Sequence, residues 1–280
     1  MLTLRADDMS LTLMPEQGAG ILGWTRGGIP LLRHAAPQAV VPGTVGEMAC
    51  FPLVPYSNRI ARGQFTFGGT SHHLALNFGD HPNSIHGVGW QRAWQVIQVA
   101  PDATTLSLDH APDVNWPFAF TAELQAYLMQ AALRIELAIT NLHGAPAPAG
   151  LGLHPFFPRG TATLQFRADA VWQNGPDMIP TARIAIPPDW DHASPRAVGS
   201  AALDNCFAGW TGTATLAWPD RTLTLEASEI FRHLVVYTPP GQDFFCVEPV
   251  SHMNDAINHA TMHVLAPGET LRGTVTFRLS

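Results

Sequence analysis

The fold class of this chain is decided by Thr121-Ala122-Glu123-Leu124-Gln125-Ala126-Tyr127-Leu128 and by Leu133-Arg134-Ile135-Glu136-Leu137-Ala138-Ile139-Thr140. The first stretch alternates polar and apolar residues, and the second does so over most of its length. Successive side chains of a strand point to opposite faces, so this period of two is typical of half-buried β-strands. Both stretches therefore predict strands rather than helices.

The same short, strand-like segments recur on both sides of this pair, whereas no stretch has the pattern of a long amphipathic helix. The further predicted strands lie around residues 64–68, 94–100, 104–108, 161–167, 213–217, 221–226, 234–237, 244–248 and 270–278. The 24 glycines and 24 prolines fall largely between them, where turns are needed. The pattern predicts an all-β fold: one large antiparallel β-sandwich domain that spans residues 1–280.

The composition supports a packed core and excludes several kinds of partner. Hydrophobic residues make up 46% of the 280 residues and charged residues only 13%, which argues against disorder. The net charge of -7, without any Arg-rich block, argues against a nucleic-acid or anionic-membrane surface. No apolar run is long enough to span a membrane, so we expect no membrane partner.

All 15 basic residues are arginines, and the absence of lysine excludes whole classes of mechanism. Schiff-base and pyridoxal-phosphate enzymes need a catalytic lysine, and a Walker A loop needs one on the phosphates. The three cysteines, Cys50, Cys206 and Cys246, are widely spaced and odd in number, so we expect buried thiols rather than disulfides. With no signal-peptide pattern at Met1–Asp8, the sequence predicts a soluble cytoplasmic protein.

Two motifs suggest cofactors, but neither has the context that a cofactor requires. Gly18–Gly23 matches GxGxxG, yet a turn-rich segment follows and no acid lies between residues 24 and 46, so a bend in a strand is the better interpretation. The histidines at 72, 73, 81 and 86 are dense, but they lack a metal-ligand spacing, and adjacent histidines on a strand point apart. We therefore predict neither a metal site nor a cofactor.

The strongest candidates for chemistry are a carboxylate and an imidazole in apolar surroundings. Glu248 follows the run Phe244–Val247, and His154 lies in the apolar segment Gly150–Phe157. Burial raises the pKa of a Glu towards the range in which it can act as a base, and a nearby His could act as its partner. For each residue alone, a structural role in the core is an equal interpretation.

Weaker candidates are polar groups in irregular segments. Asn58 and Arg59 would supply a fixed set of donors suited to hydroxyl groups, although a solvated loop arginine is the plainer interpretation. His86 lies in a glycine-rich loop near two tryptophans, where glycine allows close approach of the backbone to a ligand. Asp204 lies in a segment that reads equally well as a turn.

Taken together and in order, these segments resemble the aldose 1-epimerase (mutarotase) family. The resemblance extends from about residue 13 to 278 and depends on no single motif. The matching elements are Asn58-Arg59-Ile60, His86-Gly87 with Arg92 and Trp94, Thr140-Asn141, Gly152–Phe157, Leu203-Asp204 with Phe207, Tyr237-Thr238-Pro239 and Cys246-Val247-Glu248-Pro249.

The resemblance implies a galactose mutarotase-like β-supersandwich with an open polar cleft and a free monosaccharide as its substrate. Glu248 would be the general base and His154 the general acid of ring opening, which requires no cofactor. Arg59 and His86 would bind the sugar, with Asn58 and Asp204 as further contacts. The chain looks shorter than galactose-specific members and has Phe156-Phe157 where Tyr is common, so the sugar stays open, as does the oligomeric state.

Three other functions compete with this one. A hexose-6-phosphate 1-epimerase would need arginines, such as Arg59, Arg62 and Arg92, to converge on a phosphate. A non-catalytic sugar-binding module on the same fold would bind sugar without accelerating anomer exchange. A glycosidase uses two carboxylates, and it ranks last because the best partner of Glu248 is a histidine.

Overall fold

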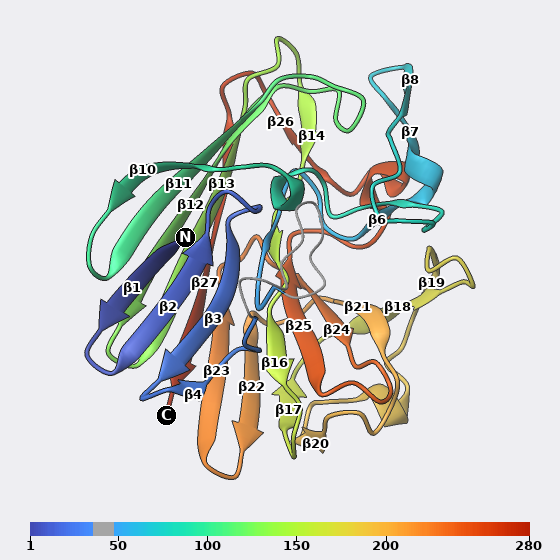
Figure 1. Ribbon diagram of the computed structural model, residues 1–280. Coiled ribbons are helices and arrows are strands. Elements are labelled where there is room, and N and C mark those ends of the chain that lie inside the picture. The colour runs from blue at the N-terminus through green and yellow to red at the C-terminus, as the bar shows by residue number, and fades with distance from the viewer. Residues whose placement is uncertain (36–47) are drawn as a thin grey trace.

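The computed structural model describes residues 1–35 and 48–280, and every pair of strands in its sheets is antiparallel (Figure 1). Its described residues contain no α-helix, only the short 3₁₀ turns η2 (Ala61–Gly63), η3 (Gly89–Gln91), η4 (Pro188–Trp190) and η5 (Ala256–His259). The all-β antiparallel fold predicted from the sequence is therefore confirmed.

The largest sheet contains the two stretches that decide the fold class, which are neighbouring strands in it. Leu124 lies opposite Leu137 in this hairpin, and the apolar side chains of both strands are buried on the same face. In spatial order the nine strands are β10 (Gln95–Val99), β11 (Ala103–His110), β12 (Phe120–Met129), β13 (Ala132–Asn141), β27 (Thr270–Leu279), β23 (Arg221–Ala227), β22 (Thr213–Trp218), β17 (Thr163–Phe166) and β20 (Arg196–Ala197).

The second large sheet has eight strands and carries the candidate site. In spatial order they are β19 (Pro180–Ile184), β18 (Ala170–Asn174), β21 (Asp204–Ala208), β24 (His233–Tyr237), β25 (Phe244–Val250), β15 (Gly152–Leu153) and β5 (Pro52–Leu53), with β16 (Phe156–Pro158) also paired to β25. Residues far apart in the sequence thus become neighbours across β25.

Smaller sheets complete the fold. A four-stranded sheet near the N-terminus contains β1 (Leu2–Ala6), β2 (Met9–Met14), β3 (Gly20–Arg26) and β4 (Ile29–Pro30). Three two-stranded pairs are β6 (Arg59–Ile60) with β9 (Ser84–Ile85), β7 (Gln64–Phe67) with β8 (Thr70–His73), and β14 (Ala147–Ala149) with β26 (His263–Leu265).

Strand β25 separates the core from the site by its alternation. Phe245 and Val247 point into the main core, where side chains of the nine-stranded sheet also pack. Cys246 and Val250 point the other way, into a smaller apolar cluster with Phe51. Glu248 has the same parity as Cys246 and therefore lies on the face away from the main core.

Strands β1 and β2 were not identified from the sequence, whereas the bend in a strand predicted at Gly18–Gly23 lies at the start of β3. Strand β3 is buried over Gly20–Trp24 without alternation, so it lacks the period-two signal that identifies a half-buried strand. Gly18 precedes it with a φ of 65°, and a side chain there would collide with the backbone of Trp90. Strand β3 begins within the GxGxxG segment and continues past it, where a dinucleotide site needs a helix.

Candidate active site

All six residues singled out as catalytic or sugar-binding candidates line one cavity of about 310 Å³. They come from five separate parts of the chain, and the eight-stranded sheet and the β6–β9 pair bring them together. The described residues that line the cavity are Phe51, Asn58, Arg59, Phe78, Ile85, His86, His154, Phe156, Asp204, Tyr237, Phe244 and Glu248.

Glu248 is buried in the middle of the sheet. It pairs with Val235 of β24, and only 3% of its side chain is exposed. Its Oε2 atom is also buried and has no hydrogen-bond partner among the residues that the structure describes. A buried carboxylate oxygen without a partner is costly, which indicates that a ligand or a proton is needed there.

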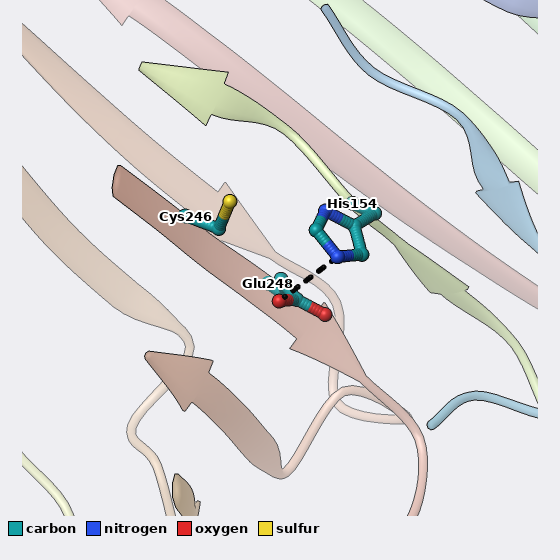
Figure 2. A group of neighbouring side chains, drawn as sticks. All are labelled: His154, Cys246 and Glu248. Carbon is teal, nitrogen blue, oxygen red and sulfur yellow. Dashed lines mark ion pairs between the residues drawn. The ribbon is translucent and has the colours of Figure 1, made fainter. Parts of the chain in front are cut away.

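His154 lies between the short strands β15 and β16, opposite Glu248 (Figure 2). Its backbone N–H donates to the carbonyl of Phe51 at 3.0 Å. The rings of Phe51 and Phe156 both stack on its ring, with centroid distances of 4.7 and 4.6 Å, and their own centroids are 6.2 Å apart. This stacking holds the imidazole so that Nε2 lies 3.4 Å from Glu248 Oε1.

Burial shifts the pKa values of this pair in opposite directions. It raises the pKa of Glu248 well above its usual 4.5, and the neighbouring Asp204 raises it further while Arg59 lowers it. Burial also lowers the pKa of His154 to about 3, and the nearby Arg33 contributes in the same direction. Both shifts favour the uncharged forms, a protonated Glu248 carboxyl and a neutral His154 ring, in which the two residues hold one proton between them.

Because the two shifts are opposite, we expect the pair to contribute most to the free energy of unfolding between pH 4.5 and pH 6.5. These limits are the ordinary pKa values of Glu and His. Within this window the folded pair holds one proton on Glu248 and the unfolded pair holds one on His154. Above pH 6.5 only the folded pair keeps its proton, so stability falls as pH rises. Below pH 4.5 the unfolded pair binds a second proton, whereas the folded pair binds it only near pH 3, the pKa of His154. The free energy of unfolding therefore falls again.

Calorimetric melting of the wild type and of Glu248→Gln across this pH range tests that expectation. Above pH 6.5 the wild type should lose up to about 1.4 kcal/mol per pH unit relative to the variant, until Glu248 ionises. The variant has no proton to lose at that position, so its own decline should be shallower. Parallel loss of Tm in the two proteins would show that Glu248 is ionised in the folded state.

His86 is fixed by reciprocal hydrogen bonds with Asn58. The N–H of Asn58 donates to His86 Nδ1 at 3.1 Å, and the N–H of His86 donates to the Asn58 carbonyl at 2.8 Å. Both residues have positive φ angles, 56° and 61°, which few residues other than glycine adopt. Because Nδ1 accepts a hydrogen bond, the ring proton lies on Nε2. Burial lowers the pKa of His86 well below 6.5, so the ring is neutral.

Arg59 connects the polar groups on the other wall. Its Nη1 donates to Asn58 Oδ1 at 3.0 Å, and its Nη2 donates to Asp204 Oδ2 at 3.3 Å. Strand β6 places it opposite Ile85 of β9, and only 12% of its side chain is exposed. Asp204 begins strand β21, so the turn that the sequence allowed at this point is not formed. The result is a preorganised set of donors and acceptors suited to hydroxyl groups.

The aromatic lining was missed by sequence reasoning. Phe51, Phe156 and Phe244 line the cavity together with Phe78 and Tyr237. A signal existed for some of them, because Phe156 and Tyr237 lie within the motifs that carried the resemblance. Phe78 comes from an irregular segment and had no such signal.

Other residues of those motifs have structural roles. Arg92 pairs with Asp113 at 2.5 Å and does not line the cavity. The Asn141 side-chain amide donates to the carbonyls of Ala145 and Leu265, which ties together the segments on either side of β14. Trp94 is buried in the main core.

One group could in principle hold a metal ion, and it is part of the site itself. His154, Cys246 and Glu248 place ligand atoms within 4.8 Å of one another (Figure 2). Burial raises the pKa of the Cys246 thiol well above 9.0, so an ion would have to displace a tightly held proton. Within the described part of the chain, His72, His73, His81 and His86 form no such group.

The whole sequence corresponds to one known family. It matches the family model described as aldose 1-epimerase over residues 1–278. The chain belongs to the aldose 1-epimerase family. Two relatives in this comparison are uncharacterized proteins of Escherichia coli K12. YphB is 27% identical and the match covers 94% of this chain and 93% of YphB; YihR is 24% identical and the match covers 91% and 85%.

Solved structures extend this assignment to the fold. A crystal structure of an E. coli K12 protein provisionally assigned as an aldose 1-epimerase has a TM-score of 0.91 and 27% identity, covering 99% of this chain and 98% of that one. A galactose mutarotase-like protein from Clostridium acetobutylicum has a TM-score of 0.86 and 18% identity, covering 99% and 94%. At 18% identity the latter shows the fold alone. The expected galactose mutarotase-like fold is confirmed.

Membrane insertion through a helix has no support in the structure. None of the helical segments in residues 1–35 and 48–280 has the length and apolar character needed to span a bilayer.

Proposed function

We propose that this member of the aldose 1-epimerase family interconverts the α- and β-anomers of a free aldose without a cofactor. The observation that carries the proposal is the contact of 3.4 Å between His154 Nε2 and Glu248 Oε1 in a cavity lined by hydroxyl-binding groups. Two buried groups that share one proton are suited to pass protons to and from a sugar in either direction.

In the proposed reaction, Glu248 takes the proton from the hydroxyl group on C1 while His154 gives a proton to the ring oxygen. The C1–ring oxygen bond breaks and C1 becomes an aldehyde, so atoms and charges balance. Rotation about the C1–C2 bond exposes the other face, and the reverse transfers close the ring. Neither proton is lost to solvent, which makes the pair ready for the next turn.

Because burial favours the uncharged pair, the reaction would begin with transfer of its proton from Glu248 to His154. A bound sugar would bring hydroxyl groups that donate to the carboxylate, and Arg59 already lowers the pKa of Glu248. The two forms have the same number of protons and differ only by a transfer across 3.4 Å. In this scheme Arg59, His86, Asn58 and Asp204 bind the remaining hydroxyl groups.

A phosphorylated sugar is a weaker candidate. Of the three arginines considered for a phosphate site, only Arg59 is among the described residues that line the cavity. Its guanidinium is already engaged by Asp204 and Asn58, and the Asp204 carboxylate would repel a phosphate. The geometry therefore favours a free aldose over a hexose 6-phosphate.

A substrate panel in the polarimeter tests the proposal. We expect enzyme-dependent, saturable acceleration of mutarotation for at least one of fresh α-D-glucose, α-D-galactose and a pentose, and slower turnover of glucose 6-phosphate. Saturable binding without acceleration would identify a sugar-binding module instead. Methyl α-D-glucoside is the control, because it has no free hydroxyl on C1; release of reducing sugar from it would indicate a glycosidase.

A further inference from the structure

A second cavity, of about 410 Å³, adjoins the candidate active site. Both cavities are lined by Asp204 and Tyr237, so they meet at these two residues. The second cavity is bordered by the β18–β19 hairpin, by the end of η4 and by the segment that leads into β21. It is larger than the first and is not needed to hold the proposed catalytic pair.

The residues of the second cavity are those that proteins use to bind neutral sugars. Gln173 and Asn174 offer amide groups for hydroxyls, and Trp190 and Tyr237 offer rings for the apolar face of a sugar. Among its described lining residues Asp204 is the only charged one. The cavity therefore favours a neutral polyhydroxyl group over an anion or a purely apolar tail.

Asn174 provides an independent indication of a polar ligand site. Its Nδ2 donates to the backbone carbonyl of Asp204 at 2.7 Å, which fixes the orientation of the amide. Its Oδ1 is buried and accepts no hydrogen bond from any residue that the structure describes. A hydroxyl group bound in this cavity would supply the missing donor.

A hydrogen bond connects the β18–β19 hairpin, which borders the second cavity, to the segment that leads into the candidate active site. The side chain of Asn83 donates to the carbonyl of Asp177, in the turn between β18 and β19, at 2.9 Å. Asn83 directly precedes β9, the strand that pairs with Arg59. This link holds the two cavities in a fixed relation, as a substrate that occupies both would require.

We propose that the second cavity is a subsite for a further sugar unit, so that the substrate is the reducing end of a neutral disaccharide or longer oligosaccharide. This inference rests on the proposed epimerase function. The reducing unit would occupy the cavity of His154 and Glu248, and the unit attached to it would extend past Asp204 and Tyr237 towards Trp190.

The test compares monosaccharides with disaccharides that have a free reducing end. Mutarotation of glucose and galactose is measured beside that of maltose, cellobiose, lactose and melibiose, which differ in linkage and configuration. We expect at least one disaccharide to have a kcat/KM about tenfold higher than that of the monosaccharide that forms its reducing unit. A tenfold increase corresponds to about 1.4 kcal/mol of additional transition-state binding.

A substitution that fills the second cavity locates the effect. Ala202 lines it and is exposed, so Ala202→Phe should occupy the cavity without disturbing the core. We expect this variant to lose the disaccharide advantage while keeping the wild-type rate on glucose. The matched control is Ala131→Phe, at an exposed turn between β12 and β13, which should change neither rate. Trp190→Ala should reduce the disaccharide advantage by removing the ring instead of filling the space.

The outcomes separate this inference from the proposed function. Acceleration of monosaccharides with no gain for any disaccharide would overturn the subsite and leave the epimerase proposal intact. A disaccharide advantage that survives both Ala202→Phe and Trp190→Ala would place the second unit elsewhere and also overturn it. Absence of acceleration for every sugar would refute the epimerase itself, and the subsite with it.

Discussion

Replacement of Glu248 by Gln is expected to lower kcat for mutarotation by about 10² to 10⁴-fold, the contribution of one positioned acid or base. The amide has the size of the carboxyl group and fits the same buried position, but it cannot accept the proton from the sugar hydroxyl on C1. Because burial favours the uncharged form of the Glu248 carboxyl, the fold should tolerate the change. The rate is measured by polarimetry on fresh α-anomer, and folding by circular dichroism.

Glu226→Gln is the matched control for this variant. Glu226 lies on the nine-stranded sheet, where its Oε2 pairs with Arg278 at 2.8 Å and about half of the side chain is exposed. The same chemical change at that position should leave the rate within about twofold of the wild type, since exposed pairs contribute little even to stability. A Glu248→Gln enzyme as active as Glu226→Gln would remove Glu248 from the mechanism.

Replacement of His154 by Asn is expected to lower kcat by a similar factor, about 10² to 10⁴-fold. Asparagine keeps a polar group opposite Glu248 but cannot exchange a proton with the ring oxygen near neutral pH. The variant also loses the stacking of the imidazole on Phe51 and Phe156, so its Tm must be measured and the rate determined well below it. A folded variant with full activity would exclude His154 as the general acid.

His72→Ala provides a comparison with another stacked histidine. The ring of His72 stacks on Phe65 with a centroid distance of 4.9 Å, but His72 is not among the described residues that line the active-site cavity. We expect this variant, and His73→Ala, to keep wild-type activity. Loss of activity in these variants as large as in His154→Asn would indicate that the effect arises from stability and not from proton transfer.

Strands with one face in the core and one in solvent gave the clearest signal in the sequence, although the almost wholly buried β24 and β25 were predicted as well. Strand β12 alternates along its whole length and β13 over most of it, and that pattern follows directly from the geometry of a half-buried strand. Strand β3 is buried on both faces over Gly20–Trp24 and therefore carries no alternation. Strand β21 begins at Asp204, in a sequence that is equally compatible with a turn.

The candidate site was predictable in its members but not in its arrangement. Glu248 and His154 were identifiable because each interrupts an apolar run, and the resemblance to a family added the polar groups around them. Their contact at 3.4 Å depends on the pairing of β16 with β25, which local sequence does not encode. The neutral state of the pair depends in turn on burial by Phe51 and Phe156, which only the assembled fold provides.

The alternation along β25 has a consequence for how such a protein can diverge. Phe245 and Val247 hold the framework, while Phe244, Cys246 and Glu248 face the opposite side. Because the two sets share a backbone but not an environment, the residues that select a ligand can be exchanged while those that maintain the architecture stay unchanged. New sugar preferences can thus accumulate on one side of a single strand without loss of folding competence.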